Sequence, residues 1–301
     1  MSTVSNPAAS NHPPTGPISL PPSTIRSWWI MLRISLEERL VYRGDFILGT
    51  LMRFLPVVTQ VFLWTAIFSA VKATGSGNIG GYDQHEVIAY FLLTMVGRAF
   101  SSMPGLASGI ARSIRDGSIK KYLIQPVDMI MFLFLGRVAH KLVYYLVATL
   151  PFALVFFICR DYFSGWPDAG TLLAFVAALI MSFVLGFFLE ATIGMIGFWF
   201  LEVSSLLFVY MLFSFFLAGQ MFPLTMLNKI HFIGSLSWGD VVLVTPFQYL
   251  AYFPAAVFLG KIHGAELARG LSIELAWCVG LILVCRWAFK SGVKRYSAFG
   301  G

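Results

Sequence analysis

The chain has 301 residues, of which 58% are hydrophobic and 12% are charged, against about 25% charged residues in soluble domains. This composition excludes an ordinary soluble domain and predicts an all-α integral membrane protein with several spans. The net charge of +7 does not indicate a nucleic-acid partner, because the basic residues lie at span ends. Cys159, Cys278 and Cys285 form no CxxC pair and no metal-binding spacing, so we expect no disulfide and no metal site.

The N-terminal region divides into two segments. Residues 1–24 contain six prolines and no charged side chain, which predicts a disordered tail. This tail lacks the basic start and apolar core of a signal peptide. Residues 25–43 place Trp28, Trp29 and Leu32 on an apolar face opposite Arg26 and Arg33. That pattern predicts a helix lying in the membrane interface, although these residues could also be the cytosolic beginning of the first span.

Two apolar segments follow, at about 46–71 and 86–108, and each is long enough to span a membrane. Small residues recur every four positions toward the end of the second segment, at Ser101, Gly105, Gly109 and Ser113. Such a ladder favours close approach of another helix.

A basic segment, residues 109–127, separates the second apolar segment from the third. Basic residues next to a span indicate the cytosolic side. Gly117 should break the segment into two short helices, and Pro126 should end the second. Charged side chains alternate with apolar ones at Arg112, Ile114, Arg115, Asp116, Ile119, Lys120, Lys121 and Leu123. The segment either sets topology alone or docks a cytosolic partner, with Ile114, Ile119 and Leu123 seated in a cleft and the charges at its rim.

A long helix is predicted over 129–158, with Arg137, His140 and Lys141 on one face near the cytosolic interface. Residues 171–222 carry only Glu190 and Glu202 as charges, which predicts two spans joined by a tight inner turn near Glu202.

Glu190 should lie near mid-membrane. A carboxylate at that depth costs about 2.5–3.5 kcal/mol on insertion scales, so it should find a cationic partner. The candidates are Arg98, Arg137 and Lys141. A packing ion pair and a role in transport are both open interpretations.

Residues 241–259 are apolar enough for a seventh span, but Pro246 and Pro254 argue against one. An additional span would also place the basic C-terminal end outside. We therefore expect short helices that enter the outer leaflet and return, which requires that they be buried in protein or line a cavity. The last span is predicted at about 266–289.

The distribution of basic residues supports six spans with both termini in the cytosol. Four basic residues fall outside in this arrangement, namely Lys72, Arg160, Lys229 and Lys261. Twelve fall inside, namely Arg26, Arg33, Arg39, Arg43, Arg112, Arg115, Lys120, Lys121, Arg286, Lys290, Lys294 and Arg295.

Motifs for catalysis are missing from the sequence. No G-x-x-x-x-G-K-[ST] loop occurs, because Gly260-Lys261 lacks both the upstream glycine and the following Ser or Thr. No HExxH, GxSxG or Cys/His ligand cluster occurs either. ATP chemistry would therefore require another chain.

Two other classes stay open as alternatives. An ion-coupled secondary transporter would need deep carboxylates, of which Glu190 is the candidate, and an internal repeat, which we do not find. An integral membrane transferase would need a polar cluster, and Asp128 with Arg137, His140 and Lys141 comes nearest to one.

The order of elements resembles the membrane subunit of a type-2 ABC exporter, and within that group the bacterial permeases encoded with a separate ATPase. The resemblance rests on the interfacial N-terminal helix, the basic KYLIQPVD turn after the second span, and the AGQMFPL and TPFQYLAYFPAAVFLG stretches before the last. It implies that 25–43 is the connecting helix, 109–127 the coupling segment and 223–260 the outer re-entrant gate. The Pro-rich tail is a departure from the family pattern.

The resemblance also implies partners and location. A cytosolic ABC ATPase dimer would bind ATP and Mg, with no cofactor in this chain, and a second permease subunit, identical or different, would complete the path. The expected location is the bacterial cytoplasmic (inner) membrane, among its lipids, with an amphipathic or hydrophobic substrate moved outward. The implied gate residues are Gly219, Phe222, Pro223, Pro246, Phe247, Tyr249 and Pro254.

Overall fold

The computed structural model describes residues 28–30, 32–34, 37, 43–73, 78–125, 127–200, 202–229, 231–233 and 236–296. The predicted tail, residues 1–24, lies outside the described residues, as does most of 25–43. The described residues of that second segment are helical, and Arg33 Nε lies 2.9 Å from Glu37 Oε1 one turn along.

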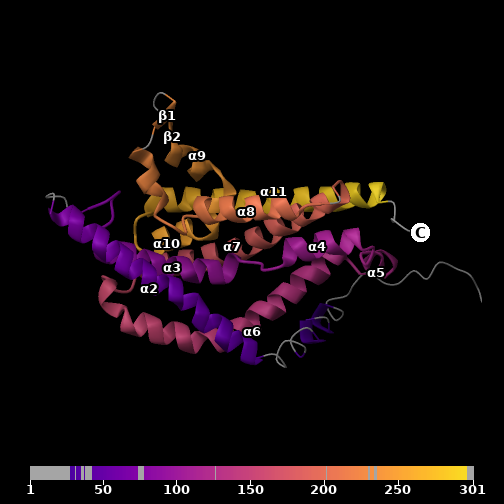
Figure 1. Ribbon diagram of the computed structural model, residues 1–301, viewed down its shortest axis with the longest axis horizontal. Coiled ribbons are helices and arrows are strands. Elements are labelled where there is room, and N and C mark those ends of the chain that lie inside the picture. Colours follow the sequence, from indigo (N-terminus) through magenta and orange to yellow (C-terminus); the bar gives the residue numbers. More distant parts are fainter. Residues whose placement is uncertain are drawn as a thin grey trace, which may run out of the picture.

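Helices make up almost all of the described structure, as predicted for an all-α protein (Figure 1). The longer ones are α2 (Arg43–Ala73), α3 (Gln84–Ser101), α4 (Leu106–Arg115), α6 (Met129–Ile158), α7 (Ala169–Met195), α8 (Ser204–Leu217) and α11 (Gly264–Arg295). The shorter elements are α5 (Lys120–Ile124), α9 (Trp238–Val244), α10 (Tyr252–Phe258), the 3-10 turns η1 (Arg160–Tyr162), η2 (Ile196–Phe198), η3 (Leu224–Lys229) and η4 (Pro246–Leu250), and the strands β1 (His231–Ile233) and β2 (Leu236–Ser237).

Within the described residues, four helical stretches are long and apolar enough to cross a membrane. They are Gln84–Arg115, Met129–Ile158, Ala169–Phe198 and Gly264–Arg295. Two shorter apolar helices, Val58–Lys72 and Ser204–Leu217, accompany them. Residues 109–127, predicted as the coupling segment and referred to by that name below, and the C-terminal end of α11 lie at one end of the molecule, and α10 lies toward the other (Figure 1).

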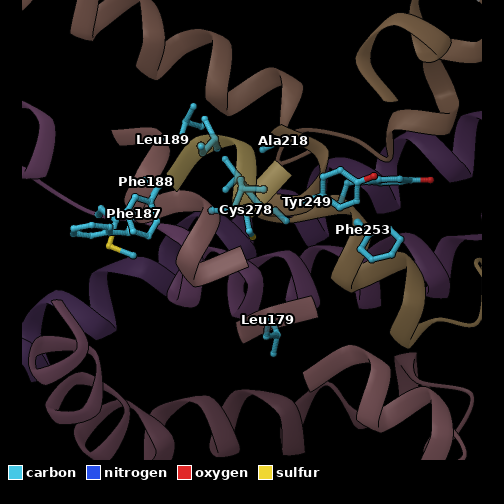
Figure 2. Packing of buried hydrophobic residues seen from close by; sticks show 14 of the residues in the cluster. Leu179, Phe187, Phe188, Leu189, Ala218, Tyr249, Phe253 and Cys278 are labelled. Atoms are coloured by element: carbon cyan, nitrogen blue, oxygen red, sulfur yellow. The ribbon is translucent and has the colours of Figure 1, made fainter. Parts of the chain in front are cut away.

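Helix α7 lies at the centre of the packing, between α11 on one side and α3 and α4 on the other. It is the most apolar of the four candidate spans, with a mean hydropathy of 2.7. Figure 2 shows the core that it builds, in which Leu179, Phe187 and Leu189 of α7 belong to the same cluster as Tyr249 of η4 and Cys278 of α11.

Glycines of α7 permit this close packing. A Cβ on Gly186 would lie 2.2 Å from the Ser101 carbonyl oxygen, and one on Gly194 would lie 2.8 Å from the Ala107 carbonyl oxygen. The predicted ladder identified the wrong glycines, because a Cβ on Gly105 or Gly109 would meet nothing within 4 Å. The close approach therefore depends on the glycines of the neighbouring helix.

Several predicted boundaries are confirmed. The third long helix covers Met129–Ile158 as expected, and the turn predicted near Glu202 falls between η2 and α8, where Glu202 Oε1 accepts a hydrogen bond from Ser204 N at 2.8 Å. The second predicted span, 86–108, falls within the candidate span Gln84–Arg115, but the chain leaves the helix between Ser102 and Gly105, which the sequence analysis did not predict. The last helix is longer than predicted, reaching Arg295.

The contact at Gly186 predicts a stability difference between two glycine substitutions. Gly186→Ala places a methyl group against backbone atoms that cannot rotate away, and overpacking of this kind costs about 1–3 kcal/mol. Gly136→Ala in α6 is the control, because its Cβ would meet nothing within 4 Å. Thermal unfolding in detergent should show a lower melting temperature for Gly186→Ala only. Equal melting of the two variants would contradict the close approach of α3 and α7.

Candidate functional site

The break between α3 and α4 lies within the stretch that would cross the membrane. Pro104 has no N–H to donate, and Gly105 adopts φ 72°, a left-handed conformation that glycine enters without a steric penalty. The break leaves the last carbonyls of α3 and the first N–H groups of α4 without helical partners. In an apolar environment each such group is costly unless another group of the protein satisfies it.

One face of α6 supplies donors to the carbonyl side of the break. Lys141 Nζ donates to the Ala99 carbonyl, and the Tyr145 hydroxyl lies 3.2 Å from the same oxygen. Arg137 Nη1 donates to the Pro104 carbonyl at 3.0 Å. These three side chains are four residues apart, so they share one helix face. Positive charge at the C-terminal end of a helix is also favourable toward the helix dipole.

Glu190 of α7 supplies the negative charge on the other side of the break. Its carboxylate accepts hydrogen bonds from the backbone N–H groups of Met103 and Ala107, the latter in the first turn of α4. Arg137 and Lys141 are the cations whose charges act on it. Two of the three candidate cations, Arg137 and Lys141, thus act electrostatically on Glu190, and the third, Arg98, lines the same cavity.

That cavity has a volume of about 720 Å³ and lies between α2, α3, α4, α7 and α8. Its walls combine apolar side chains such as Met52 and Phe215 with polar ones. The polar lining includes Gln60, Thr94, Arg98, Ser101, Glu190, Tyr210, Ser214 and Gln220. A cavity of this size and mixed lining suits an amphipathic ligand.

The coupling segment continues from α4 and has the predicted two-helix form. Gly117 adopts φ 78° between α4 and α5. Ser118 N donates to Asp116 Oδ1 at 3.0 Å, and hydrogen bonds from Ser118 lower the pKa of Asp116. Arg115 Nη1 lies 3.6 Å from Glu202 Oε2, which joins the segment to the turn before α8. Hydrogen bonds from Ser204 lower the pKa of Glu202.

The exposure of the apolar residues in this segment corrects one expectation. Ile114 is 5% exposed and Ile119 is fully buried, so both pack into this chain's own core and cannot seat in a partner's cleft. Leu123 is 38% exposed, as required for docking, and Ile124, which was not among the predicted anchors, is 83% exposed. A five-residue helix is too short for its periodicity to reveal which face is buried.

The exposed charges of the segment surround these apolar residues. Arg112, Lys120 and Lys121 are exposed. The Lys121 ammonium lies 4.8 Å from the centroid of the Tyr122 ring. The surface formed by Lys120, Lys121, Leu123 and Ile124 is called the α5 surface below.

Helix α11 holds the coupling segment from a second direction. Arg286 of α11 forms an ion pair with Asp128, whose Oδ1 also accepts from Met131 N at 2.8 Å and so caps α6. The Tyr296 hydroxyl lies 3.6 Å from the point where a Gly117 side chain would begin. Sequence reasoning gave Asp128 no such role, because its partner is far away in the chain.

The predicted gate residues lie at the opposite end, between α8 and α11. Gly219 forms the turn after α8, and Tyr90 of α3 donates to its carbonyl. Pro223, Tyr249 and Pro254 are buried, and Pro246 begins η4. Phe222 is half-buried, and the Phe247 ring centroid lies 6.2 Å from that of Tyr210 in α8. The region contains short helices, as predicted, together with the β1–β2 hairpin.

A second deep carboxylate escaped the sequence analysis, which counted Glu190 alone. Glu274 of α11 is fully buried, and neither carboxylate oxygen has a hydrogen-bond partner among the described residues. The sequence did contain a signal for it, because position 274 is a carboxylate inside the predicted span 266–289. In the described part of the chain, no three His, Cys, Asp or Glu residues come together as a metal site.

Comparison with known families decides the identity. The family described as ABC-2 family transporter protein matches residues 54–300, which include the broken helix, the coupling segment and α11. The chain belongs to the ABC-2 transporter family. It is thus an integral membrane permease of the ABC transporter class, and this membership implies association with an ABC ATPase. No curated protein gives a significant match.

The polar contacts at the break predict that Glu190 and Lys141 of the permease are energetically coupled. Glu190→Gln should lower the melting temperature in detergent, because removing one member of a buried charge pair costs about 3–5 kcal/mol. Lys141→Met in the same background should lower the melting temperature by less than it does alone, since residues that share one hydrogen-bond and charge network couple by about 0.5–3 kcal/mol. Glu202→Gln at the exposed turn is the control. A wild-type melting curve for Glu190→Gln would instead favour a role in the transport path.

Proposed function

We propose that this permease is the membrane subunit of an ATP-driven exporter that receives work from a separate cytosolic ATPase through the α5 surface. The observation that carries the proposal is the mounting of this surface. It projects from the cytosolic end of a helix whose other face is fully packed, with Leu106, Ile110 and Ile114 buried. A displacement of the surface therefore moves the packed helix.

Three contacts would pass such a displacement to the membrane helices. Gly194 of α7 approaches Ala107 and Ile110 of α4. The Arg115–Glu202 pair connects to α8, and the Asp128–Arg286 pair connects α6 to α11. An ATPase dimer holding ATP and Mg would bind two such surfaces, one from each of two permease subunits. Leu123 and Ile124 would fill its cleft, and the lysines would contact the rim.

The same proposal assigns six spans, α2, α3–α4, α6, α7, α8 and α11, with both termini in the cytosol of a bacterial inner membrane. The excess of basic residues near the coupling segment and the C-terminal end of α11 supports this orientation. Residues 223–260 would then form the outer gate. The cavity beside Glu190 would receive an amphipathic substrate on its outward path.

Exchange of the exposed anchors should separate docking from folding. Leu123→Asp with Ile124→Asp should leave the tagged permease inserted in the membrane, because both side chains are exposed. The amount of ABC ATPase that co-purifies from host membranes, measured by quantitative mass spectrometry, should fall at least tenfold. Lys120→Ala with Lys121→Ala should reduce it less, and more at low salt than at high salt, because salt screens exposed charges.

The matched control places the same charges elsewhere. Ser164→Asp with Trp166→Asp changes two exposed residues of the loop before α7, at the other end of α6 from the coupling segment, and should leave ATPase recovery unchanged. A full complement of ATPase on the Leu123/Ile124 variant would remove the α5 surface from the coupling role.

The six-span orientation has an independent test. In a cysteine-free background, Ser164→Cys should react with a membrane-impermeant maleimide added to intact cells, and Ser118→Cys should react only after the cells are opened. Both side chains are exposed, so access depends on the side of the membrane. Outside labelling at position 118 would reject the orientation.

A further inference from the structure

A second cavity, with a volume of about 880 Å³, opens between α3, α6, α7 and α10. It is called the α3–α6 cleft below. Its walls are mainly aromatic and aliphatic, and Arg160 is the one residue with a full charge among those described along it. The two cavities share Ala99, Tyr144 and Phe152, but none of the charged or amide side chains of the first cavity lines the cleft, so the two differ in chemistry.

The cleft follows the length of α6. Its lining residues on that helix extend from Tyr144 to Phe157, a rise of roughly 20 Å at 1.5 Å per residue. One leaflet of hydrocarbon is about 15 Å thick. Ala148 and Ala153 give the cleft depth because their side chains are small, while Leu154, on the face of α6 turned away from the cleft, is 59% exposed. The cleft therefore has the length of an extended acyl chain.

Aromatic rings line the wall of the cleft near one end. The Phe258 ring lies 5.1 Å from that of Phe175 and 6.2 Å from that of Phe163, measured between centroids. Phe163 stacks on Phe156 of α6 at 5.5 Å. These rings provide a continuous apolar wall between α6, α7 and α10.

The mouth at this end combines a cation with an exposed indole. Arg160 lies over the Phe157 ring at 4.9 Å, and its Nε is 3.7 Å from Asp161 Oδ1. Both side chains of that pair are more than half exposed, so the pairing is weak and leaves the guanidinium able to bind an anion. Trp166 is 86% exposed. Arginine and tryptophan together are typical of the headgroup level of a membrane.

We propose that the α3–α6 cleft binds one acyl chain of an anionic phospholipid, whose headgroup phosphate lies on Arg160 beside Trp166. The apolar walls require a hydrocarbon body, and the single cation at the mouth selects a negative head over a positive one. A soluble phosphate has no hydrocarbon part and would make no contact with the apolar walls of the cleft. The proposal requires only that the permease lie in a membrane, and it does not depend on the ATPase or on the direction of transport.

Photolabelling in nanodiscs tests the site. The full-length permease is placed in phosphatidylcholine with a minor fraction of phosphatidylglycerol that carries a diazirine on one acyl chain. Cross-linked peptides, mapped by mass spectrometry, should concentrate on the cleft face of α6, at Phe152, Ala153 and Phe156. Ala153→Trp fills the cleft and should reduce this labelling at least fivefold. Leu154→Trp, on the face of the same helix turned away from the cleft, is the matched control and should not.

The headgroup is tested separately. Arg160→Gln should lower phosphatidylglycerol labelling to the level of an equivalent phosphatidylcholine probe, and free glycerol phosphate should not compete. Because Arg160 is exposed, this variant keeps the test valid if Ala153→Trp fails to fold. Equal labelling of both α6 faces, an unchanged yield in Ala153→Trp, or an unchanged preference in Arg160→Gln would each overturn the proposal. So would an Ala153→Cys cross-link between two copies without lipid labelling, since a second copy would then cover the cleft.

Discussion

The structure depends on how the permease satisfies the backbone at the break between α3 and α4. A helix break in an apolar environment exposes carbonyls at the end of the first helix and N–H groups at the start of the next one. The hydrocarbon of lipid offers neither donors nor acceptors to these groups. Lys141 and Arg137 reach the carbonyls from α6, and Glu190 reaches the N–H groups from α7. Four helices, α3, α4, α6 and α7, are thereby fixed around one gap. This arrangement explains why charged residues stand within otherwise apolar helices, and why their signs match the ends that they contact.

The break also gives α4 mechanical independence from α3. An unbroken helix would transmit a tilt at the Arg115 end of α4 directly to the Tyr90–Gly219 contact near the far end of α3. With four non-helical residues between the two segments, α4 follows α7 instead, because its buried face meets the glycines of that helix. The buried positions of Ile114 and Ile119 strengthen this attachment. The exposed residues available to a partner therefore lie on α5, the short helix beyond Gly117.

Much of the fold could be predicted from the sequence where one segment carries its own signal. The bounds of α6 followed from a long apolar run that begins just after Asp128. The turn before α8 followed from the position of Glu202 between two apolar runs. Predictions failed where the deciding group comes from another helix. The helix break is stabilised from α6 and α7, the close approach at Ser101 depends on Gly186, and burial of Ile119 depends on the tertiary core. Single-sequence periodicity carries no information on such contacts.

Glu274 has a consequence for how the permease is made. A carboxylic side chain near mid-membrane adds about 2.5–3.5 kcal/mol to the insertion of a helix, and the hydropathy of α11 is 1.8 against 2.7 for α7. Within the described structure this side chain is enclosed by protein, with Cys278 one turn along α11 packed against Met181 of α7. The protein surface against which α11 buries Glu274 therefore exists in the bilayer only after α7 has been inserted. The order of synthesis supplies this sequence of events, since the ribosome delivers α7 before α11.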